Sequence, residues 1–493
     1  MNAALLIIFA FAALALGLGL LASRGKDMNL EQWTVAGRGF GAIFVFLLMA
    51  GEIYTTFTFL GSSGWAYGKG GPTYYILCYG SLAFILSYWM LPPIWRYART
   101  HNLISQPHYF RHRYDSPLLG GLVALVGIVA LVPYMVLQLK GLGIIVSTSS
   151  YGSISPNIAI WIGAAIVTAY VMVSGVHGSA WNAVIKDTMI LLIVVFLGIY
   201  LPLHLYGGFG AMFSAIDEAK PGFLALPERG QSVLWFSSSV LLSALGFYMW
   251  PHAFGALYTA RDAGAFRKNA IVMPLYQLIL LFVFFIGFAA LLKVPGLKGG
   301  DVDLALFRIS IQTFDPWFVG VIGGAGVLTA LVPGSLILMA TATLFANDLL
   351  SPLTGVINPD RIALIARLSV PLWALLAVSF AIGGSQTIVA LLLMGYAFVT
   401  QLFPALIASL MQRNPVSKVG AVAGIAAGVG MVALTTLRHL TLTDLLPFLP
   451  SALDDVNIGV VALVLNIFVL GAVSGVLRGP GLEAISPAGR PAQ

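Results

Sequence analysis

The sequence predicts an all-α membrane protein with about thirteen transmembrane helices. Of its 493 residues, 59% are hydrophobic and only 9% are charged, whereas soluble domains carry about 25% charged residues. A water-soluble fold needs a polar exterior that this composition cannot provide. Apolar segments of about 20 residues, the length that crosses a bilayer, recur along the chain. They lie at 3–23, 40–67, 72–92, 117–146, 157–175, 181–204, 233–258, 270–292, 316–346, 362–383, 387–411, 418–437 and 457–477.

The basic residues predict the orientation. A signal peptide has basic residues before a shorter apolar core, but here Arg24 and Lys26 follow the first apolar segment. We therefore expect a retained helix with its N-terminus outside. Basic residues then concentrate in the predicted inner loops, for example Arg96, Arg111 and Arg261, which favours an N-out, C-in protein of a bacterial inner membrane. The same pattern explains the net charge of +7 by topology, without a nucleic-acid partner.

Few residues are suited to chemistry. The single cysteine, Cys78, excludes disulfide frameworks and multi-cysteine metal sites. The seven histidines do not form a ligand-spaced pair within an apolar segment, as a membrane-embedded metalloenzyme would need. The sequence therefore predicts a protein that is not an enzyme.

Two apolar segments have unusual compositions. Segment 48–64 mixes glycines and hydroxyls with Glu52, and segment 237–255 mixes glycine, proline and serine with His252. Helix breaks persist in lipid only where the freed backbone lines a cavity or contacts protein. Close helix packing would explain the glycines but not the two ionisable residues. Because these segments are five spans apart, we expect two halves of opposite orientation with a binding site at the broken helices.

Several stretches resemble a known family. The chain is similar to the sodium:solute symporter family over roughly 3–477, and residues 51–61 look like its monocarboxylate permease branch, whose members take up lactate, pyruvate and alanine. The resemblance depends on segment 51–64, the loop Ile-Ser-Gln-Pro-His-Tyr-Phe-Arg-His-Arg-Tyr-Asp-Ser at 104–116, segment 175–181, and Met-Trp-Pro-His at 249–252.

This resemblance implies a LeuT-like core of two inverted five-helix repeats. The first would span 40–204 and the second 233–411, joined by an outer loop at 205–232. Residues 1–39 would form an extra N-terminal helix with an inner loop. Residues 412–493 would add two helices and a cytoplasmic tail.

The resemblance also implies a sodium site between the first and eighth core helices. Carbonyls near Gly51 and Tyr54 would bind the ion together with Thr329, Val332 and Pro333, since a hard cation prefers oxygen ligands. The family usually has two hydroxyl side chains where this chain has Val332 and Pro333. Either Ser335 or carbonyls exposed by a break after Pro333 would then have to supply ligands. Glu52 offers another route, because burial favours a protonated carboxyl, although a structural ion pair with Lys140 or Lys186 explains it equally well. The coupling ion is thus sodium or a proton, and no other cofactor is expected.

The substrate site is expected around the two unusual segments and the fourth span. The polar and aromatic residues there suit a small organic anion, with one cation to balance it. Instead of binding substrate, Lys140 could extend its ammonium to the outer interface, and His252 could have a purely structural role. We interpret Lys186-Asp187 as an inner gate or a structural pair near the inner surface. The candidate substrate residues are Thr55, Thr56, Tyr134, Gln138, Lys140, Trp250 and His252.

Together these features predict a secondary active symporter. It would import a small monocarboxylate of the lactate, pyruvate or alanine class, coupled to a sodium or proton gradient, and would function as a monomer in lipid. The alternatives are a sodium symporter for proline, pantothenate or a sugar, and a uniporter or channel.

The proton-carrier hypothesis for Glu52 can be tested by substitution. If Glu52 carries the coupled proton, Glu52→Gln should abolish the pH dependence of uptake, because the amide cannot titrate. The measurement is the initial uptake rate in liposomes across external pH, with folding checked by gel filtration because a broken ion pair also impairs folding. Full pH-dependent uptake by the variant would rule out this role.

Overall fold

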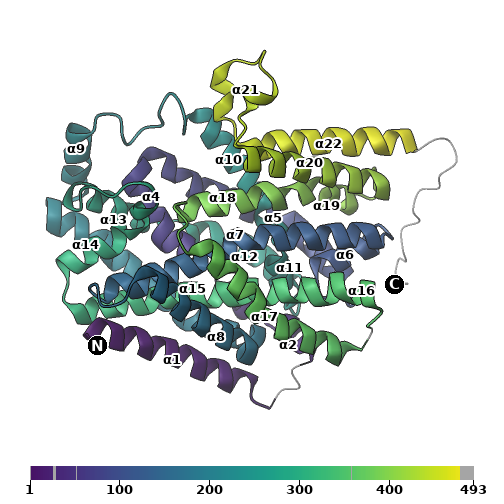
Figure 1. Cartoon of the computed structure of the whole chain (residues 1–493), viewed down its shortest axis with the longest axis horizontal. Helices are drawn as coiled ribbons and strands as arrows, with labels where there is room; N and C mark the ends of the chain where they lie inside the picture. The colour runs from purple at the N-terminus through teal and green to yellow at the C-terminus, as the bar shows by residue number, and fades with distance from the viewer. Residues whose placement is uncertain (1, 26–28, 52, 357, 478–493) are drawn as a thin grey trace.

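The computed structural model describes residues 2–25, 29–51, 53–356 and 358–477. Over this part of the chain the structure is helical, without strands. Most helices lie side by side along one direction, as expected for a bundle that crosses a membrane (Figure 1). The fold class predicted from composition is therefore confirmed.

The long apolar helices account for the predicted spans. Within the described ranges, ten helices are long and apolar enough to cross a membrane, or up to eleven if a bent pair is counted as one span. Two shorter apolar helices, Ala42–Gly51 and Pro156–Met172, coincide with the remaining predicted segments. The total of thirteen stays a prediction. The ten helices are α1 (Ala3–Ser23), η3–α5 (Gly71–Thr100), α7 (Pro117–Ser149), the second part of α8 (Gly175–Tyr206), α12–α13 (Gly264–Lys293), α15–α16 (Pro316–Thr354), α17 (Pro359–Ala381), α18–α19 (Ile388–Leu410), α20 (Lys418–Arg438) and α22 (Ile458–Leu477).

Shorter helices complete the fold at the two ends of the bundle and at the breaks. They are α2 (Leu30–Val35), α3 (Ala42–Gly51), η2 (Phe57–Gly61), α4 (Ser62–Lys69), α6 (Gln106–Arg113), α9 (Phe209–Ala219), α10 (Val233–Gly246), η4 (Phe247–Met249), α11 (Pro251–Tyr258), η5 (Gly299–Leu304), α14 (Ala305–Thr313), η6 (Leu344–Leu350) and α21 (Leu442–Leu445).

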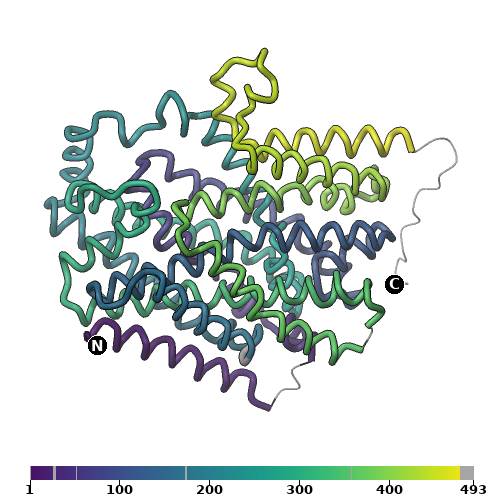
Figure 2. Tube along the Cα trace, viewed as in Figure 1, coloured from purple at the N-terminus to yellow at the C-terminus, as the bar shows by residue number. Residues whose placement is uncertain are grey.

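The two ends of the bundle differ as the orientation requires. The predicted inner elements α6 and α16 lie at the end of the bundle where α22 finishes, and the predicted outer elements α9 and α14 lie at the opposite end, near the start of α1 (Figure 1). The trace can be followed helix by helix in Figure 2. Which end faces the cytoplasm stays a prediction from the basic residues.

The breaks expected in the second and seventh spans are both present. Helix α3 ends at Gly51, and the next helical element, η2, starts at Phe57. Helices α10–η4 and α11 are bent by 48° around Trp250, whose φ and ψ of −65° and 130° are extended. The residue before a proline is disfavoured in the helical region, so Pro251 explains the second break locally.

Glycine also separates the fifth and sixth predicted spans. Helix α8 (Pro156–Tyr206) changes direction at Gly175, where φ is 52° and ψ is −158°. Residues other than glycine are strongly disfavoured at these backbone angles, because their Cβ atom clashes with the main chain. The chain therefore reverses without a long loop, and the second part of α8 returns through the bundle.

Helix α15 (Pro316–Thr343) forms the centre of the core. Nearly all its residues from Val319 onward are buried, and it packs against α1, α7, α8 and α17. Its small residues let α1 approach closely, since a Cβ on Gly320 would lie 2.9 Å from Ala4 Cα. Small residues at interfaces are how membrane helices maximise contact.

Close packing of α13 on α4 yields a stability prediction. A Cβ at Gly287 would collide with the Ser63 carbonyl oxygen and lie 2.7 Å from Ala66 Cβ. Overpacking of this kind costs about 1–3 kcal/mol, so Gly287→Ala should lower the unfolding temperature of the purified protein. Gly17→Ala in α1 is the control, because nothing lies within 4 Å of its Cβ position. Equal unfolding temperatures for both variants would contradict the close approach.

Candidate functional site

Three predicted substrate residues meet between the fourth span and the second break. The Tyr134 ring centroid lies 4.9 Å from that of Trp250 and 5.3 Å from that of His252. All three side chains are buried. Tyr134 comes from α7, whereas Trp250 and His252 flank the start of α11, so the bend in the seventh span creates this cluster.

Gln138 follows one turn after Tyr134 on the same face of α7. Its side chain is buried, yet neither its amide oxygen nor its amide nitrogen has a hydrogen-bond partner within the described ranges. Buried polar groups normally have partners. Gln138 also lines a pocket between α7, α8, α15 and α17, together with Val167, Gly334 and Ala377. An unpartnered amide in a pocket is suited to a polar ligand.

Thr56 brings the first break to the same place. A Cβ at Gly141, three residues after Gln138, would collide with the Thr56 side chain, so the two elements touch there. The Thr56 hydroxyl is buried and also has no partner within the described ranges. Thr55 differs, because its hydroxyl accepts the Phe57 N–H at 3.1 Å and thus shapes the break.

A second pocket lies between α2, α6, α11 and α15. His252 lines it with Thr34, Ser105, Gln106 and Thr343. His252 therefore borders this pocket as well as the aromatic cluster, and its position links the two.

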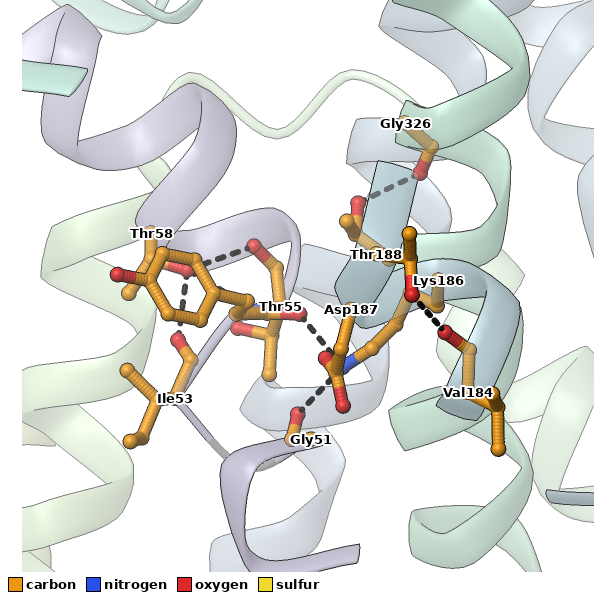
Figure 3. A network of polar contacts seen from close by, with 11 residues as sticks. Gly51, Ile53, Thr55, Thr58, Val184, Lys186, Asp187, Thr188 and Gly326 are labelled. Carbon is orange, nitrogen blue, oxygen red and sulfur yellow. Dashed lines mark hydrogen bonds and ion pairs between the residues drawn. The ribbon is translucent and has the colours of Figure 1, made fainter. Parts of the chain in front are cut away.

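Lys186 lies at the first break, not near the inner surface. Its side chain is fully buried. Its Nζ donates to the Tyr54 carbonyl at 3.1 Å and to the Gly51 carbonyl at 3.5 Å, and it lies 2.9 Å from Asp187 Oδ1 (Figure 3). The structural pair with Asp187, one of the two expected roles, is therefore present, and the reversal at Gly175 brings it to the first break inside the bundle.

The predicted ion-binding residues of the eighth core helix lie in α15. Thr329, Val332 and Pro333 are all buried. The expected break after Pro333 does not occur, since α15 is helical through this position. The Thr329 hydroxyl donates to the Gly326 carbonyl at 2.6 Å. Ser335 donates to Val332 O at 2.6 Å and its hydroxyl also lies 2.7 Å from that of Ser179. Glu52 lies outside the described residues.

Lys140 is partly exposed and has protein partners in segments of the predicted outer end. Its Nζ lies 3.2 Å from Asp303 Oδ2 and donates to the Gln386 carbonyl at 2.6 Å. Asp303 is fully buried and also accepts the Ile388 N–H at 2.9 Å. Burial raises the pKa of Asp303 to about 6, while Lys140 opposes the shift. Lys140 thus ties α7 to η5 and the start of α18, and it lines neither of the two pockets.

The family-like loop at 104–116 holds the second break. It contains the short helix α6, which is N-capped by Ser105. Gln106 Nε2 donates to the Met249 carbonyl at 2.8 Å, and Ser105 Oγ donates to Asp348 at 2.9 Å. Sequence reasoning gave Gln106 no role. The signal available was its place beside a proline in a loop that carried the resemblance.

Comparison with known proteins points to a transporter family, in agreement with two broken helices around a buried polar centre. The family model for the sodium:solute symporter family matches residues 33–428. The chain belongs to this family. It is 63% identical to "Uncharacterized symporter YhjB" of Bacillus subtilis (strain 168), over 97% of this chain and 98% of the relative. It is 27% identical to the "Monocarboxylate transport permease protein" of Rhizobium johnstonii, over 96% and 97% of the two chains.

Solved structures support the same architecture. A Na+-coupled sialic acid symporter in an outward-open state superposes with a TM-score of 0.78 at 15% identity, covering 97% of this chain and 98% of that one. A nucleobase-cation-symport-1 family transporter superposes with a TM-score of 0.58 at 12% identity, covering 90% and 95%. The fold is therefore that of LeuT-like transporters.

Family and fold establish the general function. The chain is a multi-pass protein of a bacterial inner membrane that belongs to a family of secondary active symporters, and it is not an enzyme. Membership implies a small solute as substrate and supports sodium as the coupling ion at the level of the family.

The ion pair of Lys140 leads to a stability prediction. Lys140→Met should destabilise the protein by about 3–5 kcal/mol, because it leaves the buried Asp303 carboxylate without its cation. The double variant Lys140→Met, Asp303→Asn should recover much of the loss, since an amide oxygen still accepts the Ile388 N–H. Thermal unfolding in detergent measures both. A double variant no more stable than Lys140→Met would contradict the pairing.

Proposed function

We propose that this protein imports a small monocarboxylate of the lactate, pyruvate or alanine class, coupled to a sodium or proton gradient. The observation that supports this most is that both helix breaks contact the same stretch of α7, on either side of Gln138. The Thr56 side chain of the first break meets α7 at Gly141, and Tyr134 packs against Trp250 and His252 of the second break. A substrate at this point would contact both inverted halves, as alternating access requires.

The chemistry of the site suits a small carboxylate. Thr56 and Gln138 are donors without protein partners within the described ranges, and each can donate to a carboxylate oxygen. The η2 N-terminus begins next to Thr56 and adds the positive end of a helix dipole. Aromatic rings on one side favour a short apolar body such as that of lactate or alanine. The buried Lys186 and the partly exposed Lys140 are already paired, so these neutral donors would carry recognition.

The resemblance to the Rhizobium relative favours the monocarboxylate class. Its identity of 27% extends over nearly both whole chains. The sodium/proline symporter of Salmonella typhimurium is 22% identical over 71% of this chain, and it supplies the main competing class. In the proposed cycle the substrate binds from outside near Thr56 and Gln138, the outer side closes, and one group of helices rocks against the other.

Counterflow tests the substrate class. The purified protein in liposomes loaded with unlabelled lactate, pyruvate, alanine or proline should accumulate the corresponding labelled monocarboxylate, and proline should be inactive. Sodium and proton gradients are imposed separately in a second series. Counterflow of proline without that of any monocarboxylate would overturn the proposal in favour of an amino-acid symporter.

A matched pair of glutamine variants tests the site. Gln138→Leu should raise KM by about tenfold, the effect of one lost hydrogen bond to a charged ligand, without loss of thermal stability. Gln277→Leu is the control, because Gln277 is also buried but donates to the Ile76 carbonyl at 3.1 Å. It should lower stability and leave KM unchanged. An unchanged KM in a folded Gln138→Leu protein would exclude Gln138 from the substrate site.

A further inference from the structure

Lys186 contacts the two carbonyls predicted to bind sodium. Its ammonium lies 3.1 Å from Tyr54 O and 3.5 Å from Gly51 O, and no part of the side chain is exposed. A Cβ added to Gly51 would lie only 3.4 Å from Nζ, so the nitrogen is held directly against the end of α3. In Figure 3 the ammonium lies between the two sides of the break.

The packing of α8 on α15 brings the other half of the predicted ion site to the same level. The hydroxyls of Ser179 and Ser335 are 2.7 Å apart, and the ring centroids of Phe196 and Phe318 are 5.4 Å apart. The number of residues between the two contacts is the same in both helices. The contact that comes first along α8 comes second along α15, so the two helices are antiparallel and both contacts belong to one register. In that register Lys186 lies opposite Leu328, next to Thr329.

The oxygen atoms at this position do not form a sodium site. Sodium needs several oxygen ligands around it, but the Gly51 and Tyr54 carbonyls already accept hydrogen bonds from the ammonium. The Thr329 hydroxyl donates to Gly326 O and keeps only its acceptor lone pairs for an ion. Val332 and Pro333 have no side-chain oxygen, so these three residues offer sodium one side-chain ligand at most. A second cation beside the ammonium would also be repelled by it.

The ammonium can do structurally what a bound sodium ion would do. It has three N–H donors, of which two meet backbone carbonyls freed by the break. Asp187 lies 2.9 Å away and balances its charge, as a buried cation requires. The positive charge that organises the first break is therefore covalently attached to α8.

We infer that the Lys186 ammonium takes the place of the sodium ion predicted at this position, so that this family member binds no sodium there and transports without it. Of the two gradients that the sequence left open, this favours the proton gradient. The transport arm of the test below rests on the proposed function, whereas the binding arm does not.

Sodium binding to the purified full-length protein tests the inference without any substrate. The measurements are thermal unfolding in sodium chloride against choline chloride at equal ionic strength, and equilibrium binding of radioactive sodium. A ligand that binds the native state raises the unfolding temperature with its concentration. The wild type should show no sodium-specific rise and no saturable binding.

Substitution of Lys186 should create a sodium site. Lys186→Met removes the charge and leaves the Asp187 carboxylate beside the Gly51 and Tyr54 carbonyls, which is a suitable oxygen set for sodium. Its unfolding temperature should be lower than that of the wild type in choline and should rise with sodium. Lys186→Arg retains the cation, and Lys186→Met with Asp187→Asn removes the carboxylate. Both controls should be insensitive to sodium.

The possible results separate the hypotheses. An equal response of wild type and Lys186→Met to sodium overturns the inference, whether both respond or neither does. If Lys186→Met cannot be purified folded, saturable sodium binding by the wild type overturns it and absence of such binding supports it. In liposomes, wild-type counterflow should be the same in sodium and choline. Absence of counterflow for every tested solute would count against the proposed substrate alone, because the binding measurements still decide the role of Lys186.

Discussion

Backbone carbonyls released by a helix break cannot be solvated by lipid, and each one left unsatisfied costs several kcal/mol. The break between α3 and η2 releases such carbonyls at Gly51 and Tyr54. The Lys186 ammonium donates a hydrogen bond to each of them. Asp187 balances the charge from the same helix.

The second break is stabilised in a different way. Pro251 favours the extended conformation of Trp250, the residue before it. The side-chain amide of Gln106 in α6 donates a hydrogen bond to the Met249 carbonyl, which the break leaves without a helical partner. The family-like loop is therefore a structural clamp on the broken helix. Ser105 and Gln106 of this loop line one pocket together with His252.

Much of this architecture could be predicted because it depends on local properties. Length and apolar content identify a membrane helix directly, and every predicted span coincides with an apolar helix or a part of one. Glycine, threonine and proline weaken helices where they stand, so both breaks were predicted at the right places. Tyr134, Trp250 and His252 do lie together, as expected of residues placed around a break and the fourth span, while their role in binding stays a prediction. The contacts of Lys140 with Asp303 and of Lys186 with the carbonyls of the first break were not predicted, because they join segments far apart in the sequence.

The sequence by itself determined that this chain is a helical membrane protein with two broken helices, because hydropathy and helix-breaking residues act over a few neighbouring positions. The link to symporters came separately, from the resemblance of its motifs to a known family. Only the tertiary structure decided which charged groups meet the breaks. Asp303 is the partner of Lys140 although it lies 163 residues away, and Lys186 reaches Gly51 across 135 residues. The Lys186 contacts depend on how α8 turns back at Gly175 and the Lys140 pair on how η5 packs against α7, and close packing of distant segments sets both.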